Sequence, residues 1–144
     1  CYFCNKVNPT LKALVEDYDG KVSVVFKDFP LGNHPRAMPA AVAARCAGDQ
    51  GRYWEMNEVL LGNQSALSDD DFKTYAERLE LDGEAFASCL TSGSHDAAVR
   101  AAAAQGEALG VQATPTFYVN GVLVSGAQPY DVLKSVIDQE LAKR

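Results

Sequence analysis

The first apolar positions of the chain are spaced three and four residues apart. They are Phe3, Val7, Leu11, Leu14, Val15 and Tyr18. This spacing follows one face of a helix with about 3.6 residues per turn, and the helix is predicted to end near residues 19–20. Pro9 lies inside it and is expected to kink it, because proline lacks the amide hydrogen. The next apolar run, residues 22–26, is short and rich in β-branched side chains, which predicts a buried strand.

Helical periodicity continues between residues 34 and 110. The predicted helices cover residues 34–48, 51–61, 68–79, 82–92 and 94–110. Ser68 and Asp71 are spaced as a capping box, and Ser94 is expected to cap the last of these helices. Trp54 and Leu61 are the expected apolar anchors of the second one. This stretch therefore predicts a helical insertion.

The last third of the chain returns to strand patterning. Two short apolar segments, residues 116–119 and 122–124, flank Asn120 and Gly121. Asn-Gly suits the positive φ angles of a type I′ turn, which predicts an antiparallel hairpin. A final helix is expected to begin at Pro129. Its predicted buried face holds Val132, Leu133, Val136, Ile137 and Leu141. The complete pattern indicates an α/β domain.

Composition narrows the class of protein. A length of 144 residues fits one domain, and 47% hydrophobic with 22% charged residues is typical of a globular chain. A net charge of -6 argues against a nucleic-acid partner, which would favour a basic surface. No apolar run approaches the roughly 20 residues that cross a bilayer.

Two of the four cysteines carry the candidate chemistry. Cys1 and Cys4 form a CxxC at the start of the first helix. The free amides and the positive dipole of a helix N-terminus stabilise a thiolate, most strongly at the first position, so Cys1 is the expected nucleophile. The spacing lets the second sulfur reach the first, as disulfide exchange requires.

A structural zinc site is the competing interpretation of this CxxC. Such a site needs four ligands, but the sequence has no second CxxC or CxxH. His34 and His95 also lack ligand spacing with each other, so no metal is expected.

Thr114 and Pro115 stand directly before the predicted hairpin. A proline at the start of a strand belongs at an edge or a special turn, because it cannot donate a ladder hydrogen bond. If the bond between them is cis, the loop exposes backbone groups of Thr114 to an extended peptide. The alternative is a trans proline that only separates helix from strand.

Cys46 and Cys89 are the two remaining cysteines, and each shares a predicted helix face with apolar side chains. They are therefore expected to point inward within the insertion. They are a candidate structural disulfide, which would close a loop of about 44 residues. Two buried free thiols acting as small hydrophobic side chains are the alternative.

Five segments together resemble a known family. They are CYFCNKVNPTL, VVFKDFPLGNHPRAMPAA, AARCAGDQGRYWEMNEVLL, ASCLTSG and GEALGVQATPTFYVNG. They resemble the DsbA family of thioredoxin-fold thiol–disulfide oxidoreductases along almost the whole chain. The resemblance implies that Cys1 is the nucleophile and Cys4 the resolving cysteine. It also implies that Pro115 is a cis-proline facing this pair and that Thr114 contacts the substrate backbone.

The implied fold is a single thioredoxin-like domain over residues 1–144. Its thioredoxin core would comprise residues 1–30 and 94–144, with the helical insertion at about residues 31–93. In the family a strand bearing a buried acidic residue runs into the CxxC, whereas this sequence begins at Cys1. We therefore expect the natural polypeptide to continue upstream with that strand and a secretion signal.

The sequence departs from the family between the cysteines. Tyr2 and Phe3 replace the proline-containing dipeptides common there, and they are candidate substrate-binding residues. Without a histidine at this place, one stabiliser of the thiolate is lost, which bears on the oxidising power.

The resemblance also implies a periplasmic or other extracytoplasmic location in a bacterium. The expected function is a dithiol oxidase that passes a disulfide to unfolded or extended client proteins. A membrane quinone-linked oxidase of the DsbB or vitamin K epoxide reductase type would restore the disulfide, with no dissociable cofactor. The alternatives are a reductase or isomerase of the same fold, and a redox-inert module that binds peptides in the cis-proline groove.

Overall fold

The computed structural model describes residues 1–144 and divides the chain into two compact units. One unit combines residues 1–26 with residues 111–144, and the other comprises residues 27–110. The domain boundaries expected near residues 30 and 94 stay a prediction.

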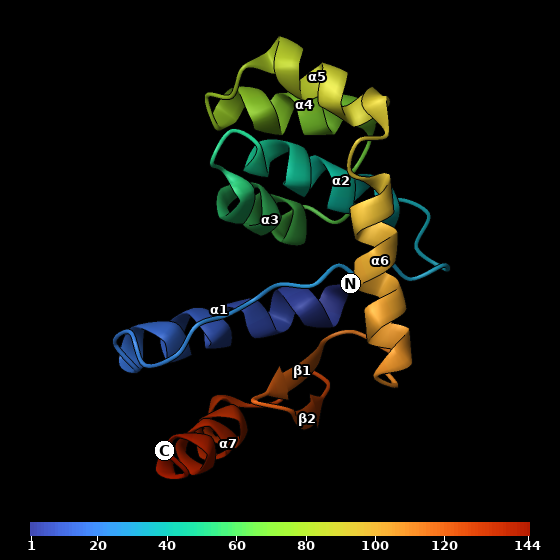
Figure 1. Ribbon diagram of the computed structural model, residues 1–144. Coiled ribbons are helices and arrows are strands. Elements are labelled where there is room, and N and C mark those ends of the chain that lie inside the picture. The colour runs from blue at the N-terminus through green and yellow to red at the C-terminus, as the bar shows by residue number, and fades with distance from the viewer. The chain divides into compact units, whose positions relative to one another are not determined.

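The first unit contains two helices and a hairpin (Figure 1). Its elements are α1 (Tyr2–Asp17), β1 (Thr116–Val119), β2 (Val122–Ser125) and α7 (Tyr130–Ala142). The strands pair antiparallel, with Thr116 opposite Ser125. Asn120 and Gly121 at the turn have φ angles of 48° and 89°, so the predicted hairpin is confirmed.

The apolar core of this unit lies between α1, the hairpin and α7. Its buried members are Val7, Leu14, Val124, Leu133 and Ile137. Val132 was predicted to join them but is 41% exposed. The buried stripe of α7 follows Leu133 and Ile137, four positions apart, and the residue before Leu133 turns about 100° away from it.

Residues 22–26 form no strand, so that prediction was wrong. The only sheet consists of β1 and β2, and it offers these residues no neighbour. Val24, Val25 and Phe26 are 37%, 74% and 42% exposed, so the segment is not buried either. Strand propensity mainly reflects packing against partner strands, and without a partner it does not produce a strand.

The second unit is built from five helices. They are α2 (Ala37–Gly48), α3 (Tyr53–Gly62), α4 (Asp69–Arg78), α5 (Gly83–Ser92) and α6 (Asp96–Ala108). α2 contacts each of the other four, as its central place among them in Figure 1 illustrates. The largest fully buried side chains of this unit are those of Phe72, Phe86 and Met56.

Helix starts in this unit follow their sequence signals only in part. Ser68 and Asp71 form the predicted capping box of α4. The prediction that Ser94 caps α6 was wrong, since His95 is the N-cap residue and Ser94 accepts a hydrogen bond from the Ser92 hydroxyl. Trp54 is no anchor of α3, because it is 53% exposed.

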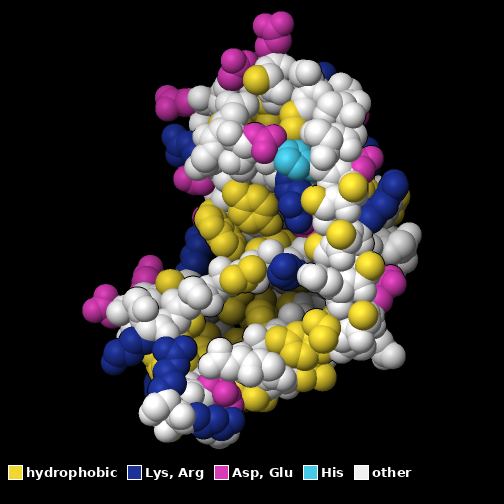
Figure 2. Space-filling view, viewed as in Figure 1, with side chains coloured by type: hydrophobic (Ala, Val, Ile, Leu, Met, Phe, Trp, Pro, Cys, Tyr) yellow, Lys and Arg dark blue, Asp and Glu magenta, His cyan; other side chains and the backbone are white.

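Figure 2 shows acidic and basic side chains interspersed over the visible face, with apolar side chains between them. No helix combines the length and the apolar character that a membrane span requires.

Candidate active site

Cys1 and Cys4 lie in the first turn of α1, within the unit that also holds the hairpin. Cys1 is the N-cap residue, and its sulfur accepts a 3.2 Å hydrogen bond from the backbone amide of Cys4. An oxygen usually fills this role at an N-cap. Here a sulfur takes it, so a thiolate on Cys1 meets both an amide donor and the positive end of the helix dipole.

The loop before β1 brings Thr114 to the same sulfur. The Thr114 hydroxyl donates a hydrogen bond of 3.1 Å to Cys1 Sγ. In the opposite direction, the Cys1 thiol donates to the Thr114 carbonyl oxygen at 3.4 Å. The loop therefore offers a donor to the thiolate and an acceptor to the thiol, and both protonation states of Cys1 find a partner.

Pro115 follows Thr114 across a cis peptide bond. The Pro115 carbonyl accepts a 2.9 Å hydrogen bond from the amide of Gly126, just after β2. On the other side, the Thr116 hydroxyl donates to the Ala113 carbonyl at 2.7 Å. These bonds tie the loop to the hairpin and hold Thr114 in place beside Cys1.

Cys4 has a different environment from Cys1. Burial raises the pKa of the Cys4 thiol above its ordinary value of 9.0, although the neighbouring Thr114 hydroxyl acts in the opposite direction. Cys4 is thus a thiol at neutral pH. Neither cysteine of the pair forms a disulfide, and both are partly buried.

Tyr2 and Phe3 occupy the two positions between the cysteines. Their side chains are 69% and 55% exposed, and the two rings meet edge to face at 5.3 Å. They place apolar surface next to the sulfurs. Their role in substrate binding stays a prediction.

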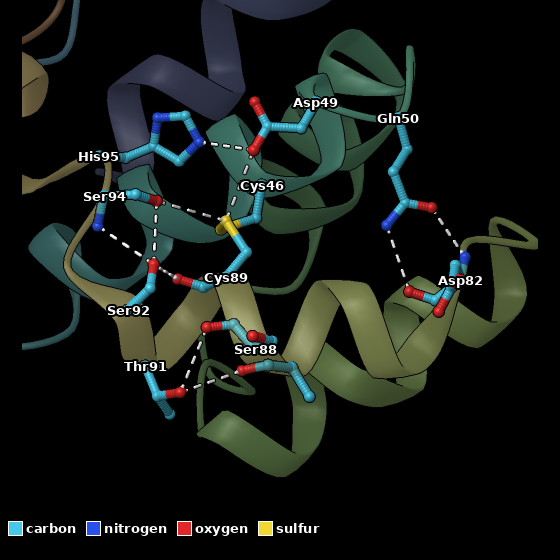
Figure 3. Close-up of a disulfide and its surroundings, with 11 residues drawn as sticks. Cys46, Asp49, Gln50, Asp82, Ser88, Cys89, Thr91, Ser92, Ser94 and His95 are labelled. Carbon is cyan, nitrogen blue, oxygen red and sulfur yellow. Dashed lines mark hydrogen bonds and ion pairs between the residues drawn. A yellow bond between two sulfur atoms is a disulfide. The ribbon is translucent and has the colours of Figure 1, made fainter.

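The structure separates the four cysteines into two pairs. Cys46 on α2 and Cys89 on α5 are joined by a disulfide within the helical unit, with their Cα atoms 5.8 Å apart (Figure 3). Cys46 is only 1% exposed, whereas Cys89 is partly exposed. Asp49 and His95 lie beside this bond, next to Cys89, and no local spacing in the sequence connects them with the two cysteines.

Thr114 also has a contact that the sequence did not reveal. The resemblance implied that its backbone binds substrate, but its hydroxyl contacts the sulfur of Cys1. The two residues are 113 positions apart, so no local signal indicates this hydrogen bond.

A CxxC at a helix start beside a Thr-Pro loop, within this fold, defines the thioredoxin-like thiol–disulfide oxidoreductases. The chain belongs to the thioredoxin family, whose sequence profile matches residues 1–139. The resemblance noted from the sequence is confirmed, as is its thioredoxin-like, DsbA-like fold, which here is mostly helical with a small sheet.

Solved structures share this fold. A thioredoxin-like oxidoreductase from Silicibacter pomeroyi DSS-3 is 25% identical with a TM-score of 0.87, covering 99% of this chain and 81% of that one. The thiol-disulfide exchange protein α-DsbA2 from Wolbachia pipientis is 22% identical with a TM-score of 0.81, covering 96% of this chain and 75% of that one. A periplasmic thioredoxin-like protein from Salmonella enterica serovar Typhimurium is 23% identical with a TM-score of 0.78, covering 99% and 79%.

Curated relatives with higher identity are named as membrane transporters. Na(+)/H(+) antiporter NhaA 1 of Salinispora arenicola is 34% identical over 143 residues, which are 99% of this chain and 22% of the antiporter. Na(+)/H(+) antiporter NhaA 3 of Salinispora tropica is 36% identical over 133 residues, 92% of this chain and 20% of that protein. The chain thus spans about a fifth of the length of these relatives.

Proposed function

We propose that the chain is a dithiol oxidase that introduces disulfides into extracytoplasmic proteins through Cys1 and Cys4. The observation that carries this proposal is the pair of donors on Cys1 Sγ, the Cys4 amide and the Thr114 hydroxyl. Donors to the thiolate stabilise the reduced form of the pair. A stabilised reduced form makes the corresponding disulfide a stronger oxidant.

The reaction starts from the Cys1–Cys4 disulfide. A client thiolate attacks Cys1 Sγ, a client–Cys1 disulfide forms, and Cys4 leaves as a thiolate that takes up a proton. A second client thiolate attacks the client sulfur of this mixed disulfide and expels the Cys1 thiolate. The client thereby loses two electrons and gains a disulfide, while Cys1 and Cys4 gain two electrons and end as the dithiol.

The sulfurs of Cys1 and Cys4 differ in how the site stabilises their thiolates. Cys1 leaves as a thiolate that meets two hydrogen-bond donors, which favours release of the oxidised client. The raised pKa of Cys4 favours its protonated form at neutral pH, so it attacks the mixed disulfide slowly. This difference favours the oxidising direction over the reverse one.

An extracytoplasmic location is part of the proposal. The Cys46–Cys89 disulfide in the helical unit supports it, because structural disulfides persist mainly in oxidising compartments. A membrane quinone-linked oxidase of the DsbB or vitamin K epoxide reductase type is the proposed reoxidant of the Cys1–Cys4 dithiol. No dissociable cofactor enters the reaction, since the two sulfurs carry both electrons.

The reduction potential of the Cys1–Cys4 pair, equilibrated against glutathione, tests the direction. We expect a value above about -200 mV, and a value near -270 mV would assign the chain to the reductases. The oxidised chain should also form disulfides in a reduced, unfolded two-cysteine protein, and Cys1→Ser should abolish this. A redox-inert peptide-binding module would bind that protein without exchange in either form.

The antiporter relatives support a second candidate function, a thiol-redox module joined to a transport protein. The supporting observation is that this chain matches about a fifth of several proteins named Na(+)/H(+) antiporters. An antibody against the chain tests this candidate in the source cells. A membrane-bound polypeptide several times larger than the chain supports it, and a polypeptide of the chain's own size excludes it.

A further inference from the structure

Four side chains with metal-binding atoms meet at the second cysteine pair, within the helical unit (Figure 3). α2 supplies Cys46 and its C-cap residue Asp49, α5 supplies Cys89, and His95 is the N-cap residue of α6. The two sulfurs and a ring nitrogen of His95 all lie within 4.8 Å of one another. Asp49 Oδ2 is 2.8 Å from His95 Nε2 and 3.6 Å from Cys89 Sγ.

We propose that reduction of the Cys46–Cys89 disulfide creates a Zn²⁺ site with Cys46, Cys89, His95 and Asp49 as its four ligands. A dithiol reductant supplies two electrons and two protons, breaks the sulfur–sulfur bond and is itself oxidised to a disulfide. Zn²⁺ then displaces the two thiol protons and binds two thiolates, a neutral imidazole and a carboxylate. The donor types are those that Zn²⁺ takes in proteins.

The existing distances are close to those of a tetrahedral zinc site. With Zn–S near 2.3 Å and Zn–N or Zn–O near 2.1 Å, a sulfur and an oxygen ligand stand about 3.6 Å apart. Asp49 Oδ2 and Cys89 Sγ are 3.6 Å apart. Two N/O ligands stand about 3.4 Å apart, so the 2.8 Å between Asp49 Oδ2 and His95 Nε2 needs only a small widening.

The two sulfurs need the largest movement. In a tetrahedral site they stand about 3.8 Å apart, which only the broken disulfide permits. Their Cα atoms, 5.8 Å apart, lie on two packed helices, so rotation of the side chains rather than of the helices supplies this separation. Zinc binding and the disulfide therefore exclude each other, and bound zinc holds the pair reduced.

The burial and the charge of the four ligands also suit a zinc site that is covered except on the side of Asp49. Cys46 is 1% exposed and the His95 side chain 20%, whereas the Asp49 side chain is 56% exposed and gives an ion access. Two thiolates and a carboxylate bring three negative charges to one point, and a divalent cation offsets two of them.

Cobalt and zinc binding to the full chain test the proposal, in a Cys1→Ser/Cys4→Ser variant that removes the competing CxxC. After reduction by a phosphine, which does not bind as a thiol would, we expect one equivalent of Co²⁺ with tetrahedral thiolate-type absorption. Zn²⁺ should displace it, and the oxidised protein should bind neither. Cys89→Ser and His95→Ala should each weaken metal binding by about 100-fold or more. Loss of a residue that only hydrogen-bonds a ligand weakens binding by about 10- to 100-fold.

Ser94→Ala is the matched control. The Ser94 hydroxyl lies 4.0 Å from Cys89 Sγ but is not among the four ligands, so this variant should bind cobalt as before. If reduction melts the helical unit, Zn²⁺ must restore its circular dichroism signal, and failure to do so overturns the proposal. Stoichiometric binding that survives both Cys89→Ser and His95→Ala, or no stoichiometric binding at all, overturns it as well.

Discussion

The Thr114 hydroxyl donates a 3.1 Å hydrogen bond to the sulfur of Cys1, although 113 positions separate the two residues. The bond joins the first turn of α1 to the loop before β1. The nucleophile is therefore complete only when both ends of the chain have folded into one unit. Thr114 consequently sets how readily the Cys1 thiolate forms and how readily it leaves a mixed disulfide.

Thr114→Val keeps the shape of the side chain and removes this donor. One hydrogen bond contributes about 1 kcal/mol net, so the ratio of Cys1 thiolate to thiol should fall about fivefold at a given pH. The ultraviolet absorbance of the thiolate, followed against pH in the reduced protein, measures this. Thr74→Val is the control, because its hydroxyl donates to the Asp70 carbonyl within α4 and contacts neither the loop nor a sulfur. Identical titrations of the two variants would contradict the assigned role of Thr114.

Cys4→Ala should trap the covalent intermediate. The Cys1 thiolate should attack the client sulfur of an unfolded one-cysteine protein that is capped as a disulfide with thionitrobenzoate, and the thionitrobenzoate thiolate leaves. Because neither Cys4 nor a second client thiol is present to attack the resulting client–Cys1 disulfide, this adduct should accumulate until most of the chain carries a client. Mass spectrometry after mixing the reduced variant with this capped protein detects the adduct. Cys1→Ser should give no adduct under the same conditions. An adduct on Cys4 in that variant would reverse the assignment of nucleophile and resolving cysteine.

Cys4 should also make the stability of the reduced protein depend on pH. Burial raises its pKa in the folded state above the ordinary 9.0, so above pH 9.0 the unfolded chain has lost more protons than the folded one. By linkage, the free energy of unfolding falls as pH rises from the pKa of Cys4 in the unfolded chain to its pKa in the folded one. Below the pKa of the unfolded chain, Cys4 makes its full contribution to stability. Urea unfolding of the reduced protein below and above pH 9.0 measures this fall in the free energy of unfolding. The decline should be smaller in Cys4→Ala, and an equal decline would exclude Cys4 as its source.

Local sequence signals predicted those parts of the fold that local interactions determine. The Asn120-Gly121 turn and the Ser68–Asp71 capping box each depend on residues within a few positions of one another, and both formed as expected. The strand predicted for residues 22–26 did not form, because a strand needs a partner strand elsewhere in the chain and local signals do not show whether one is present. Trp54 shows the same limit, since its helix packs through Met56 and Leu60 instead.

The candidate site divides in the same way. The Cys1–Cys4 spacing and the helix start are local, and the sequence contains both. The contact of Thr114 with Cys1 and that of His95 with Asp49 depend on how distant segments pack. The family resemblance implied that the loop with Thr114 and Pro115 lies near Cys1 and Cys4, but it implied neither of these two contacts.

The Cys46–Cys89 disulfide should stabilise the protein substantially. It closes a loop with a sequence separation of 43, for which the chain-entropy model gives about 4 kcal/mol. Cys46→Ala/Cys89→Ala should lower the free energy of unfolding by about that amount, measured by urea denaturation in the presence of a metal chelator. The wild-type chain with this bond reduced, under the same conditions, is the control for the lost sulfur atoms. Equal stability of the oxidised wild type and the double variant would show that the bond adds nothing.

The ion pair between Asp28 and Arg45 should be the costliest one to break by a single substitution. Arg45 Nε lies 2.7 Å from Asp28 Oδ2, and the Asp28 side chain is only 4% exposed. Arg45→Met leaves a buried carboxylate without its partner, so it should lower the free energy of unfolding by about 3 kcal/mol. Arg52→Met breaks the pair with Glu55, whose side chain is 46% exposed, and should cost less than about 1 kcal/mol.

A double variant separates two causes of the stability lost in Arg45→Met, the unpaired charge of Asp28 and the lost packing of the arginine side chain. Asp28→Asn added to Arg45→Met removes the unpaired charge but does not restore the arginine, so it should recover a large part of the stability. Urea denaturation at neutral pH of the wild type, both single variants and the double variant gives the coupling between the two positions. Additive losses would show that the buried charge of Asp28 is not what Arg45 compensates.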